Sequence, residues 1–528
     1  MVSRGSAINW VINMTMDLSG QATQELWSNL PCMHIKVGAL RWHQDAEALQ
    51  AAGGRLLTLW GADDRDRDGR FRIYAVYLLK EGVAVFEHAM DQGAKPTYPS
   101  LAEIFPCALH MERAVHDLVG IASMEPDHRG WLRHGGWPQT VFPLRRDFDG
   151  KTQFSNDSQP YEFVQVEGDG VHEIAVGPVH AGTIEPGHFR FSVVGEKVLR
   201  LEERLGYTHK GVSKRFEEMS QLEGHRLAAR LSGDSAVAFS WAYCAALEAI
   251  TQTNCPPRAA NLRALAVEHE RLANHLGDLG ALGNDAGFAF GLTQFSRMKE
   301  DLLRVNTSAF GARYLFDFVQ PGGVAADLPE DAPRLLEAHY RMLEEGVSCL
   351  RSIYDSHAGL QDRFREAGVL KQELAERLGA IGLAGRASGV PVDLRVDYPC
   401  SPYDRLEPRL VTQSTGDVAA RVQVRFDEIF ESLRLCRMLL EDSASGPIHT
   451  DCPFAAPGRL GLGLIEAWRG PVVIALESGP DGTIRRCHAH DPSWQNWPLL
   501  EYAILGNIVP DFPLINKSFN LSYSGHDG

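Results

Sequence analysis

An acidic run near residue 65 has residue types that could bind a divalent cation. Asp64, Asp66 and Asp68, followed by Gly69, have the spacing of the first half of a calcium-binding EF-hand loop. The twelfth position of that loop is Ala75, where such a site needs a bidentate Glu. Strand-forming residues follow where the motif requires a helix, so the pattern favours a charged hairpin over a calcium site.

A histidine pair further along could ligate zinc. His269 and Glu270 match the start of a zinc-protease helix motif, in which the second His follows the first by four residues. Here the next histidine is His275, six residues after His269, so a helix would place the two side chains on different faces. We therefore expect His269 to be a structural histidine that is paired with a neighbouring carboxylate or carbonyl.

The nine cysteines could form disulfides or hold metal clusters. They are scattered, and no two have the C-x-x-C spacing. This argues against a disulfide framework, a zinc ribbon or an iron-sulfur cluster within this chain. Their positions are Cys32, Cys107, Cys244, Cys255, Cys349, Cys400, Cys436, Cys452 and Cys487.

Composition indicates a folded, acidic protein of several cores. The chain has 528 residues, 44% of them hydrophobic, and its formal charge is 52 − 68 = −16 without a long basic run, so we expect no nucleic-acid partner. The most apolar stretch, 236–250, contains Ser240 and Glu248 and is shorter than the ~20 residues of a spanning helix. We see no secretory signal and expect a cytoplasmic protein that meets a membrane through partners.

Periodicity divides the chain into an N-terminal α/β module and a mainly helical remainder. Residues 54–90 read as strands and 100–118 as a helix, whereas 147–162 are rich in Gly, Ser, Asn, Asp and Pro. We predict domains at 1–150 and 171–528, joined by a linker at 151–170. Within the second domain we predict β structure at 171–201, a helical bundle at 202–445 and a mixed segment at 446–528.

Two long amphipathic helices support the predicted bundle. Residues 261–280 place leucines at spacings of three and four, with Asn261 as the expected N-cap and Gly280 as the expected stop. Residues 417–442 repeat this pattern. Helices of this length predict antiparallel packing, and the fold class is α+β multidomain.

Two segments of the first module resemble a known family. Residues 98–121, YPSLAEIFPCALHMERAVHDLVGI, and 143–148, PLRRDF, are similar to the signature of the small peripheral subunit of respiratory complex I. That module performs no chemistry in the family. The resemblance implies that Glu112, Arg113 and Asp117 hold a docking surface together.

Five further motifs, in order, resemble the large subunits of group-four, energy-converting nickel-iron hydrogenases and of complex I. The resemblance implies an N-terminal α/β module fused to a hydrogenase-large-subunit-like helical bundle with flanking β segments. The motifs are GVHEIAVGPVHAGTIEPGHFRF (170–191), LGYTHKGVSKRFEEM (205–219), EHERLANHLGDLG (268–280), RASGVPVDLRVDYP (386–399) and GLIEAWRGP (463–471).

The chain departs from these hydrogenases at the nickel ligands. The family holds nickel with two C-x-x-C pairs, and the corresponding positions here are Ser232 and Ser235 in the first segment and Ser522 and Gly525 in the last. A serine hydroxyl stays protonated near neutral pH and is a poor, hard ligand for a metal that thiolates hold. We expect no nickel-iron site and no metal bound by this chain.

In complex I the large subunit has also lost the nickel site, and the cavity left there receives quinone. A His in a G-P-x-H loop and a Tyr bind the quinone head group. The resemblance places the His at His180 and the Tyr at Gly233, so one of the two donors is missing. Protonation of reduced quinone needs groups such as histidine. The candidate catalytic residues are His180, His209 and Asp234, and the candidate cavity-lining residues are His180, Ser232, Ser235 and Ser522.

Three functions follow from the resemblance. The first is an oxidoreductase subunit, active only within a complex, that passes electrons from an iron-sulfur small subunit to quinone or another small acceptor. The second is a metal-free scaffold of such a complex, and the third and least favoured is a nickel-iron hydrogenase. Antiporter-like membrane subunits are the other expected partners, with the chain peripheral on the cytoplasmic side of the membrane. We also expect Ser232, Ser235 and Ser522 to lie together at the edge of a cavity near His180.

Overall fold

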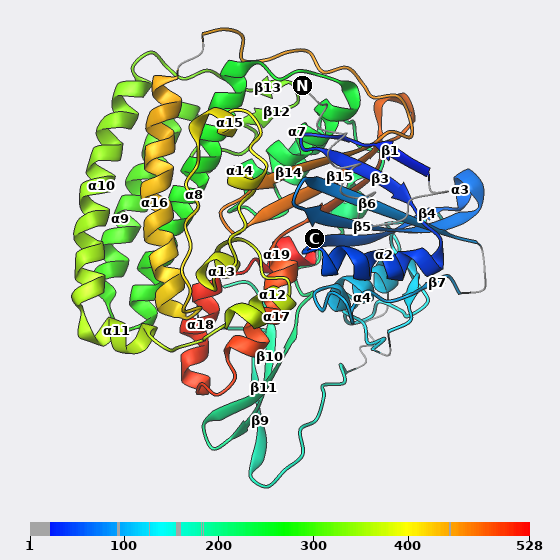
Figure 1. The fold of residues 1–528 in the computed structure, drawn as a ribbon, viewed down its shortest axis with the longest axis horizontal. Coiled ribbons are helices and arrows are strands. Elements are labelled where there is room, and N and C mark those ends of the chain that lie inside the picture. The colour runs from blue at the N-terminus through cyan, green and yellow to red at the C-terminus, as the bar shows by residue number, and fades with distance from the viewer. Residues whose placement is uncertain are drawn as a thin grey trace.

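The computed structural model describes residues 22–91, 95–125, 127–154, 160–180, 182, 184–442 and 445–528. Its architecture is mixed α+β, as predicted, with several sheets beside a helical bundle (Figure 1). The absence of a secretory signal was predicted for the first residues of the chain, which lie outside the described ranges. Among the described helices, none is both long and apolar enough to cross a bilayer.

The N-terminal module is a five-stranded sheet with helices on one face. Its strand order is β1(Ala22–Glu25), β3(Cys32–Lys36), β6(Gly82–Met90), β5(Arg70–Leu79) and β4(Arg55–Asp64), and only β3 and β6 run parallel. Helices α2(Ala39–Ala51) and α4(Ala108–Val119) cover one face (Figure 1). The strands predicted at 54–90 are confirmed, whereas the helix expected from residue 100 begins at Ala108.

The other face of this sheet packs against a second, four-stranded sheet from the C-terminal segment. Its strand order is β16(Ile484–His490), β15(Pro471–Ser478), β14(Leu460–Glu466) and β2(Trp27–Ser28), so the N-terminal segment supplies one edge. Leu57 and Val76 of the first sheet share a core with Leu464 and Val473 of the second. The two predicted domains therefore pack as one body; their exact boundaries stay predictions.

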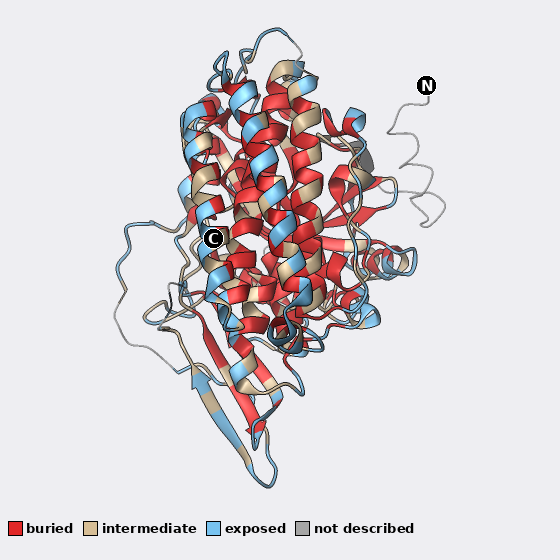
Figure 2. Cartoon of the chain, turned by 90° about the vertical axis from the view of Figure 1, so that its left-hand side faces the viewer, coloured by how far each residue is buried: buried red, intermediate tan, exposed pale blue. Residues whose placement is uncertain are grey.

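Four long helices stand side by side as the predicted bundle (Figures 1 and 2). They are α8(Pro257–Asp285), α9(Ala289–Phe310), α10(Ala332–Ser356) and α16(Val418–Glu441), and a fifth, α7(Ala236–Thr251), packs on β14 and β15. The helix predicted at 417–442 is confirmed as α16, and the Asp417 side chain caps it by accepting a hydrogen bond from the backbone N of Ala420. The predicted limits of α8 were wrong, because Gly280 is an internal residue that lets α9 approach: a Cβ there would lie 3.1 Å from Phe295.

A three-stranded sheet, β11(Lys197–Arg204), β10(His188–Val194) and β9(Val171–Val176), projects from the body (Figures 1 and 2). The remaining elements are short. They are α3(Arg65–Asp68), β7(Thr97–Tyr98), β8(Ala122–Ser123), α5(Val212–Phe216), α6(Gly224–Ala228), β12(Val319–Gln320), β13(Gly323–Val324), α11(Ala358–Phe364), α12(Gln372–Arg377), α13(Gly382–Ala387), α14(Leu394–Asp397), α15(Tyr403–Leu406), η1(Pro480–Gly482), α17(Ser493–Ala503), η2(Val509–Asp511), α18(Phe512–Phe519) and α19(Tyr523–Asp527).

Both metal-like motifs have structural roles. Asp64 lies in the hairpin between β4 and β5 and forms ion pairs with Arg72, Arg485 and Arg486 at 2.9–3.0 Å. His269 is fully buried, with Nδ1 2.7 Å from the amide oxygen of Asn306 and Nε2 2.6 Å from a tyrosine hydroxyl. The charged-hairpin and structural-histidine interpretations are confirmed.

Candidate functional site

The serine segments that lie far apart in the sequence meet in the interior of the protein. Ser232 Oγ donates a hydrogen bond to Asp234 Oδ1 at 2.6 Å and lies 2.8 Å from Ser522 Oγ. Because Ser232 has a single hydroxyl hydrogen, Ser522 must donate to it, and Ser522 Oγ in turn accepts from the backbone N of Gly525 at 2.9 Å. The result is one directed hydrogen-bond chain in which the two serines are 2–3% exposed.

Arg469 completes this group, which we call the serine cluster and define as Ser232, Asp234, Ser235, Ser522 and Arg469. The guanidinium forms two hydrogen bonds with the Asp234 carboxylate, at 2.8 and 2.5 Å, and a longer one with Ser235 Oγ at 3.5 Å. It also donates to the backbone oxygen of Asn520 at 2.5 Å. The cluster therefore joins the segment before α7, the turn between β14 and β15, and the C-terminal segment.

The Asp234 carboxylate is held ionised. Burial raises its pKa, but the charge and hydrogen bonds of Arg469 and the hydroxyl of Ser232 outweigh burial and lower the pKa to about 2. At neutral pH Asp234 is thus an anion that orients Arg469 and Ser232. This state does not suit the proton-donor role considered for Asp234 from the sequence.

Asp491 adds a second carboxyl group beside the cluster. Its Oδ1 accepts from the backbone N of Ser493 at 2.8 Å, whereas its buried Oδ2 has no hydrogen-bond partner among the described residues. Burial raises the pKa of Asp491. A Cβ on Gly525 would lie only 2.6 Å from Asp491 Oδ2, so the close approach of the C-terminal turn to this carboxyl requires glycine.

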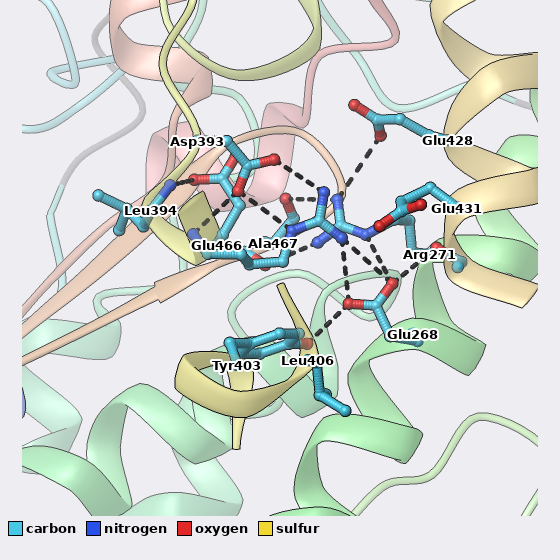
Figure 3. Close-up of polar contacts among 12 residues, drawn as sticks. Glu268, Arg271, Asp393, Leu394, Tyr403, Leu406, Glu428, Glu431, Glu466 and Ala467 are labelled. Atoms are coloured by element: carbon cyan, nitrogen blue, oxygen red, sulfur yellow. Dashed lines mark hydrogen bonds and ion pairs between the residues drawn. The ribbon is translucent and has the colours of Figure 1, made fainter. Parts of the chain in front are cut away.

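A buried ionic network supports the turn that carries Arg469 (Figure 3). Arg271 of α8 donates to the backbone oxygens of Glu466 and Ala467 at 2.9 and 3.1 Å. Figure 3 shows how carboxylates and guanidiniums from α8, α14, α16 and β14 converge on this point. The other ion pairs of the network are Arg386–Glu428 at 2.7 Å, Arg386–Glu466 at 2.9 Å, Arg395–Glu268 at 3.1 Å and Arg395–Asp393 at 2.7 Å.

The charges of this network balance if one carboxyl group keeps a proton. Three arginines, Arg271, Arg386 and Arg395, face four carboxyl groups. Burial, together with the charge of nearby Asp393, raises the pKa of Glu466 to about 7, which makes Glu466 the proton-bearing member. We call this fully buried network the ionic brace and define it as Arg271, Arg386 and Arg395 with Glu268, Asp393, Glu428 and Glu466. It holds the residues that directly precede Arg469 in the sequence.

The candidate histidines lie outside the serine cluster. His180 Nε2 forms a hydrogen bond with the backbone oxygen of Gly187 at 2.9 Å. Gly187 packs against Tyr523 so closely that a Cβ added to the glycine would lie 2.5 Å from the tyrosine ring. His209 Nδ1 bonds the backbone oxygen of Asp527 at 2.7 Å. The structure thus brings Ser232, Ser235 and Ser522 together. His209 bonds the backbone of α19, whereas His180 bonds Gly187, which packs on α19. Among the described residues no hydrogen bond joins either histidine to the serines.

Neither of two cavities in the described part of the protein is lined by the serine cluster. One, of about 60 Å³, lies between α4, β4 and β16 around Trp60 and His488. The other, of about 460 Å³, lies beside α7 around Trp241 and Arg263. The predicted cavity at the serines therefore stays a prediction.

Comparison with known proteins agrees with this arrangement. Residues 35–154 match the family described as the respiratory-chain NADH dehydrogenase 30 Kd subunit, and residues 285–459 match the 49 Kd subunit of the same enzyme. Formate hydrogenlyase subunit 5 of Escherichia coli is 31% identical to the chain, over 90% of the chain and 85% of the relative. The chain belongs to the hydrogenase-like large-subunit family of complex I and group-four hydrogenases.

Other relatives of this hydrogenase-like large subunit belong to respiratory complexes. The C/D subunit of the NADH-quinone oxidoreductase of Bacteroides thetaiotaomicron is 26% identical, over 88% of the chain and 92% of the relative. A solved chain from a membrane-bound sulfane sulfur reductase, an archaeal respiratory membrane complex, has the same fold, with a TM-score of 0.64 at 24% identity over 68% of this chain and 98% of that one. The relatives are oxidoreductase subunits of multisubunit complexes, and this chain is a subunit of that type.

The donors at the serine cluster do not fit a nickel-iron centre. Its hydroxyls are committed to hydrogen bonds with Asp234 and with each other, and Gly525 offers no side chain. Nickel in such sites is held by thiolates, for which protonated hydroxyls are poor substitutes. We therefore derive no step through nickel in this hydrogenase-like large subunit.

Sequence reasoning missed Arg469 and Asp491. Arg469 lies in the motif GLIEAWRGP, which carried the family resemblance, but nothing in its spacing indicated a partner 235 residues away. Asp491 follows HAH in an ordinary turn sequence, and only the fold places it beside Gly525.

Proposed function

We propose that this hydrogenase-like large subunit is the electron-accepting subunit of a membrane complex and passes electrons from an iron-sulfur partner to a quinone near the serine cluster. The observation that carries the proposal is the pair of buried serine hydroxyls that contact an Arg–Asp pair, at positions where the family resemblance predicts metal ligands. Such a site stabilises oxygen atoms that gain negative charge, because hydroxyls and a guanidinium are hydrogen-bond donors.

Each group has a role in this proposal. The Arg469 guanidinium lies in the cluster and stabilises charge that develops on a quinone oxygen during reduction. His180 donates through Nε2, since the Gly187 oxygen can only accept, and this leaves Nδ1 for a proton that is transferred to the reduced head group. Asp234 and the ionic brace hold Arg469 in position.

The proposed assembly has an iron-sulfur small subunit, with antiporter-like membrane subunits as further partners. In this arrangement the chain is peripheral, on the cytoplasmic side of the membrane. The names of the relatives support a membrane complex in general terms, because formate hydrogenlyase and NADH-quinone oxidoreductase are multisubunit enzymes.

A metal-free scaffold is the second candidate function. One observation favours it: at Gly233, where the resemblance to complex I predicts a quinone-binding Tyr, there is no side chain, and among the described residues beyond its chain neighbours only Phe316 lies within 4 Å of the position of a Cβ. A scaffold of this kind would hold the iron-sulfur subunit on the membrane arm without accepting electrons.

The test is electron transfer in the complex purified with a tagged form of this chain from gently solubilised membranes. We expect mass spectrometry to find an iron-sulfur subunit and membrane subunits, and the complex to reduce a short-chain quinone. His180→Ala should slow this reaction by on the order of 10²-fold. The control is His172→Ala on β9, whose exposed ring makes only a 3.5 Å contact with the backbone of Gly170.

The outcomes separate the two functions. Equal quinone reduction in wild type and His180→Ala would remove His180 from the mechanism. An intact complex that never reduces quinone would contradict the proposal and favour the scaffold. Stoichiometric nickel in the purified complex would contradict both.

A further inference from the structure

Two glutamates outside the serine cluster meet where α17 packs on β11. Glu203 of β11 is 1% exposed, and neither oxygen of its carboxyl group has a hydrogen-bond partner among the described residues. Glu501 of α17 is half-buried, and its Oε1 accepts a hydrogen bond from the backbone N of Glu203 at 2.9 Å. Burial of a carboxyl group without hydrogen-bond partners costs folding free energy, most of all when the group is ionised.

The surroundings of Glu203 are apolar. In the β10–β11 register Glu203 lies opposite Phe189, whose ring is 6.1 Å from that of Trp497. Within the described residues no Lys, Arg or His lies within 4 Å of the Glu203 carboxylate. The neighbouring Glu202 differs, because it forms an ion pair with Arg129 at 2.6 Å.

Two carboxyl groups in this setting cannot both be ionised near neutral pH. Burial raises the pKa of Glu203 well above its ordinary value, and the charge of Glu501 raises it further. Burial also raises the pKa of Glu501, to about 7, against the opposing hydrogen bond from the Glu203 backbone. The other titratable or charged groups that act on the pair are Tyr523 of α19, Glu202 and Arg200 of β11 and Arg113 of α4.

One neighbour of Glu501 on α17 connects the pair to the segment that carries Ser522. Trp497 precedes Glu501 by one turn of α17, contacts the ring of Tyr523 at 4.8 Å and donates to the backbone oxygen of Ser522 at 3.4 Å. The charge of Arg200 lowers the pKa of Glu501, and the Arg200 side chain is 41% exposed to solvent. A proton on the pair is therefore about one helical turn from the residues that contact the cluster.

We propose that Glu203 and Glu501 hold one exchangeable proton between them and deliver it toward the serine cluster when a quinone is reduced there. This role rests on the function proposed above. In the balanced reaction the quinone gains two electrons from the iron-sulfur partner and two protons, and becomes the quinol. The pair supplies one proton and is reprotonated from solvent past Arg200, while His180 supplies the other.

The first measurement needs no turnover. Infrared difference spectra of the purified complex between pH 5 and pH 8 should contain the C=O band of a protonated carboxyl group. Glu203→Gln and Glu501→Gln should each remove that band. Glu173→Gln is the matched control, since Glu173 is an exposed carboxylate of the same sheet and is paired with Arg190 at 2.9 Å; its spectrum should keep the band.

The second measurement is quinone reduction in the same complexes. Glu203→Gln should slow it by on the order of 10²-fold at pH 8 with unchanged reduction of the iron-sulfur partner. Absence of the band in wild type overturns the shared proton, whatever the activity. A band that Glu203→Gln removes without slowing quinone reduction overturns the relay. Failure of the wild-type complex to reduce quinone overturns the proposed function and the relay with it, whereas the band still decides whether the proton is shared.

Discussion

Ser232 Oγ and Ser522 Oγ lie 2.8 Å apart although 290 positions separate them in the sequence. Both side chains are buried, and the contact links the segment before α7 to the N-terminus of α19. Two positions at which the family resemblance predicts metal ligands are thus joined here by a hydrogen bond.

Replacement of Ser232 should weaken this link. Ser232→Ala removes the donor to Asp234 and the acceptor for Ser522, and we expect a loss of about 1–3 kcal/mol of unfolding free energy, because buried polar groups lose their partner. Denaturant unfolding of the purified chain measures this loss. Ser235→Ala is the control, since the one hydrogen bond of the Ser235 hydroxyl within the described part of the chain is the 3.5 Å contact with Arg469. Equal losses in both variants would contradict the chain of hydrogen bonds.

The stability that Asp234 contributes to the protein should be lost in acid. Its folded pKa of about 2 lies below the ordinary 3.8, so its contribution is fully present above pH 3.8 and is lost as pH falls toward 2. The shift corresponds to about 2 kcal/mol, reduced by solvent screening to about 1 kcal/mol because the side chain is 38% exposed. We expect Asp234→Asn to lower the melting temperature at pH 6 and to flatten its dependence on pH between 4 and 2. An unchanged acid slope would refute the ion pair.

Gly525 should resist even a single added methyl group. Gly525→Ala places a Cβ 2.6 Å from Asp491 Oδ2 and 2.9 Å from Ser522 Oγ, and the required shift should cost about 1–3 kcal/mol. Gly150→Ala is the control, because no atom of the described residues beyond its chain neighbours lies within 4 Å of a Cβ there. Adding Asp491→Ala to Gly525→Ala should restore part of the loss in thermal unfolding. No recovery in the double variant would mean that another contact makes glycine necessary.

The ionic brace should be sensitive to the loss of one arginine. Arg386→Leu removes the guanidinium that pairs with Glu466 and leaves buried Glu428 with only the longer 3.7 Å contact to Arg271 and with His275 at 2.8 Å, and we expect a loss of about 3–5 kcal/mol. The exposed pair Arg297–Asp301 is the comparison, since Arg297→Gln should produce no measurable change in unfolding. Similar effects of the two substitutions would contradict the burial of the brace.

Local patterns in the sequence carried much of the architecture. The strands at 54–90, the helix after Asp417 and the charged hairpin at Asp64 depend on side-chain period, capping and turn chemistry, all of which act between near neighbours. The limits of α8 were missed because Gly280 serves contact with another helix, which is a tertiary requirement.

The sequence by itself determined the residue types at Ser232, Ser235, Ser522 and Gly525, the positions where the family resemblance predicts metal ligands. Only the tertiary structure decided what these residues contact. Arg469, Asp491 and the Glu203–Glu501 pair acquire their chemistry from partners that are remote in the chain, because hydrogen bonds, charge and burial depend on distance in space. No local pattern encodes those distances.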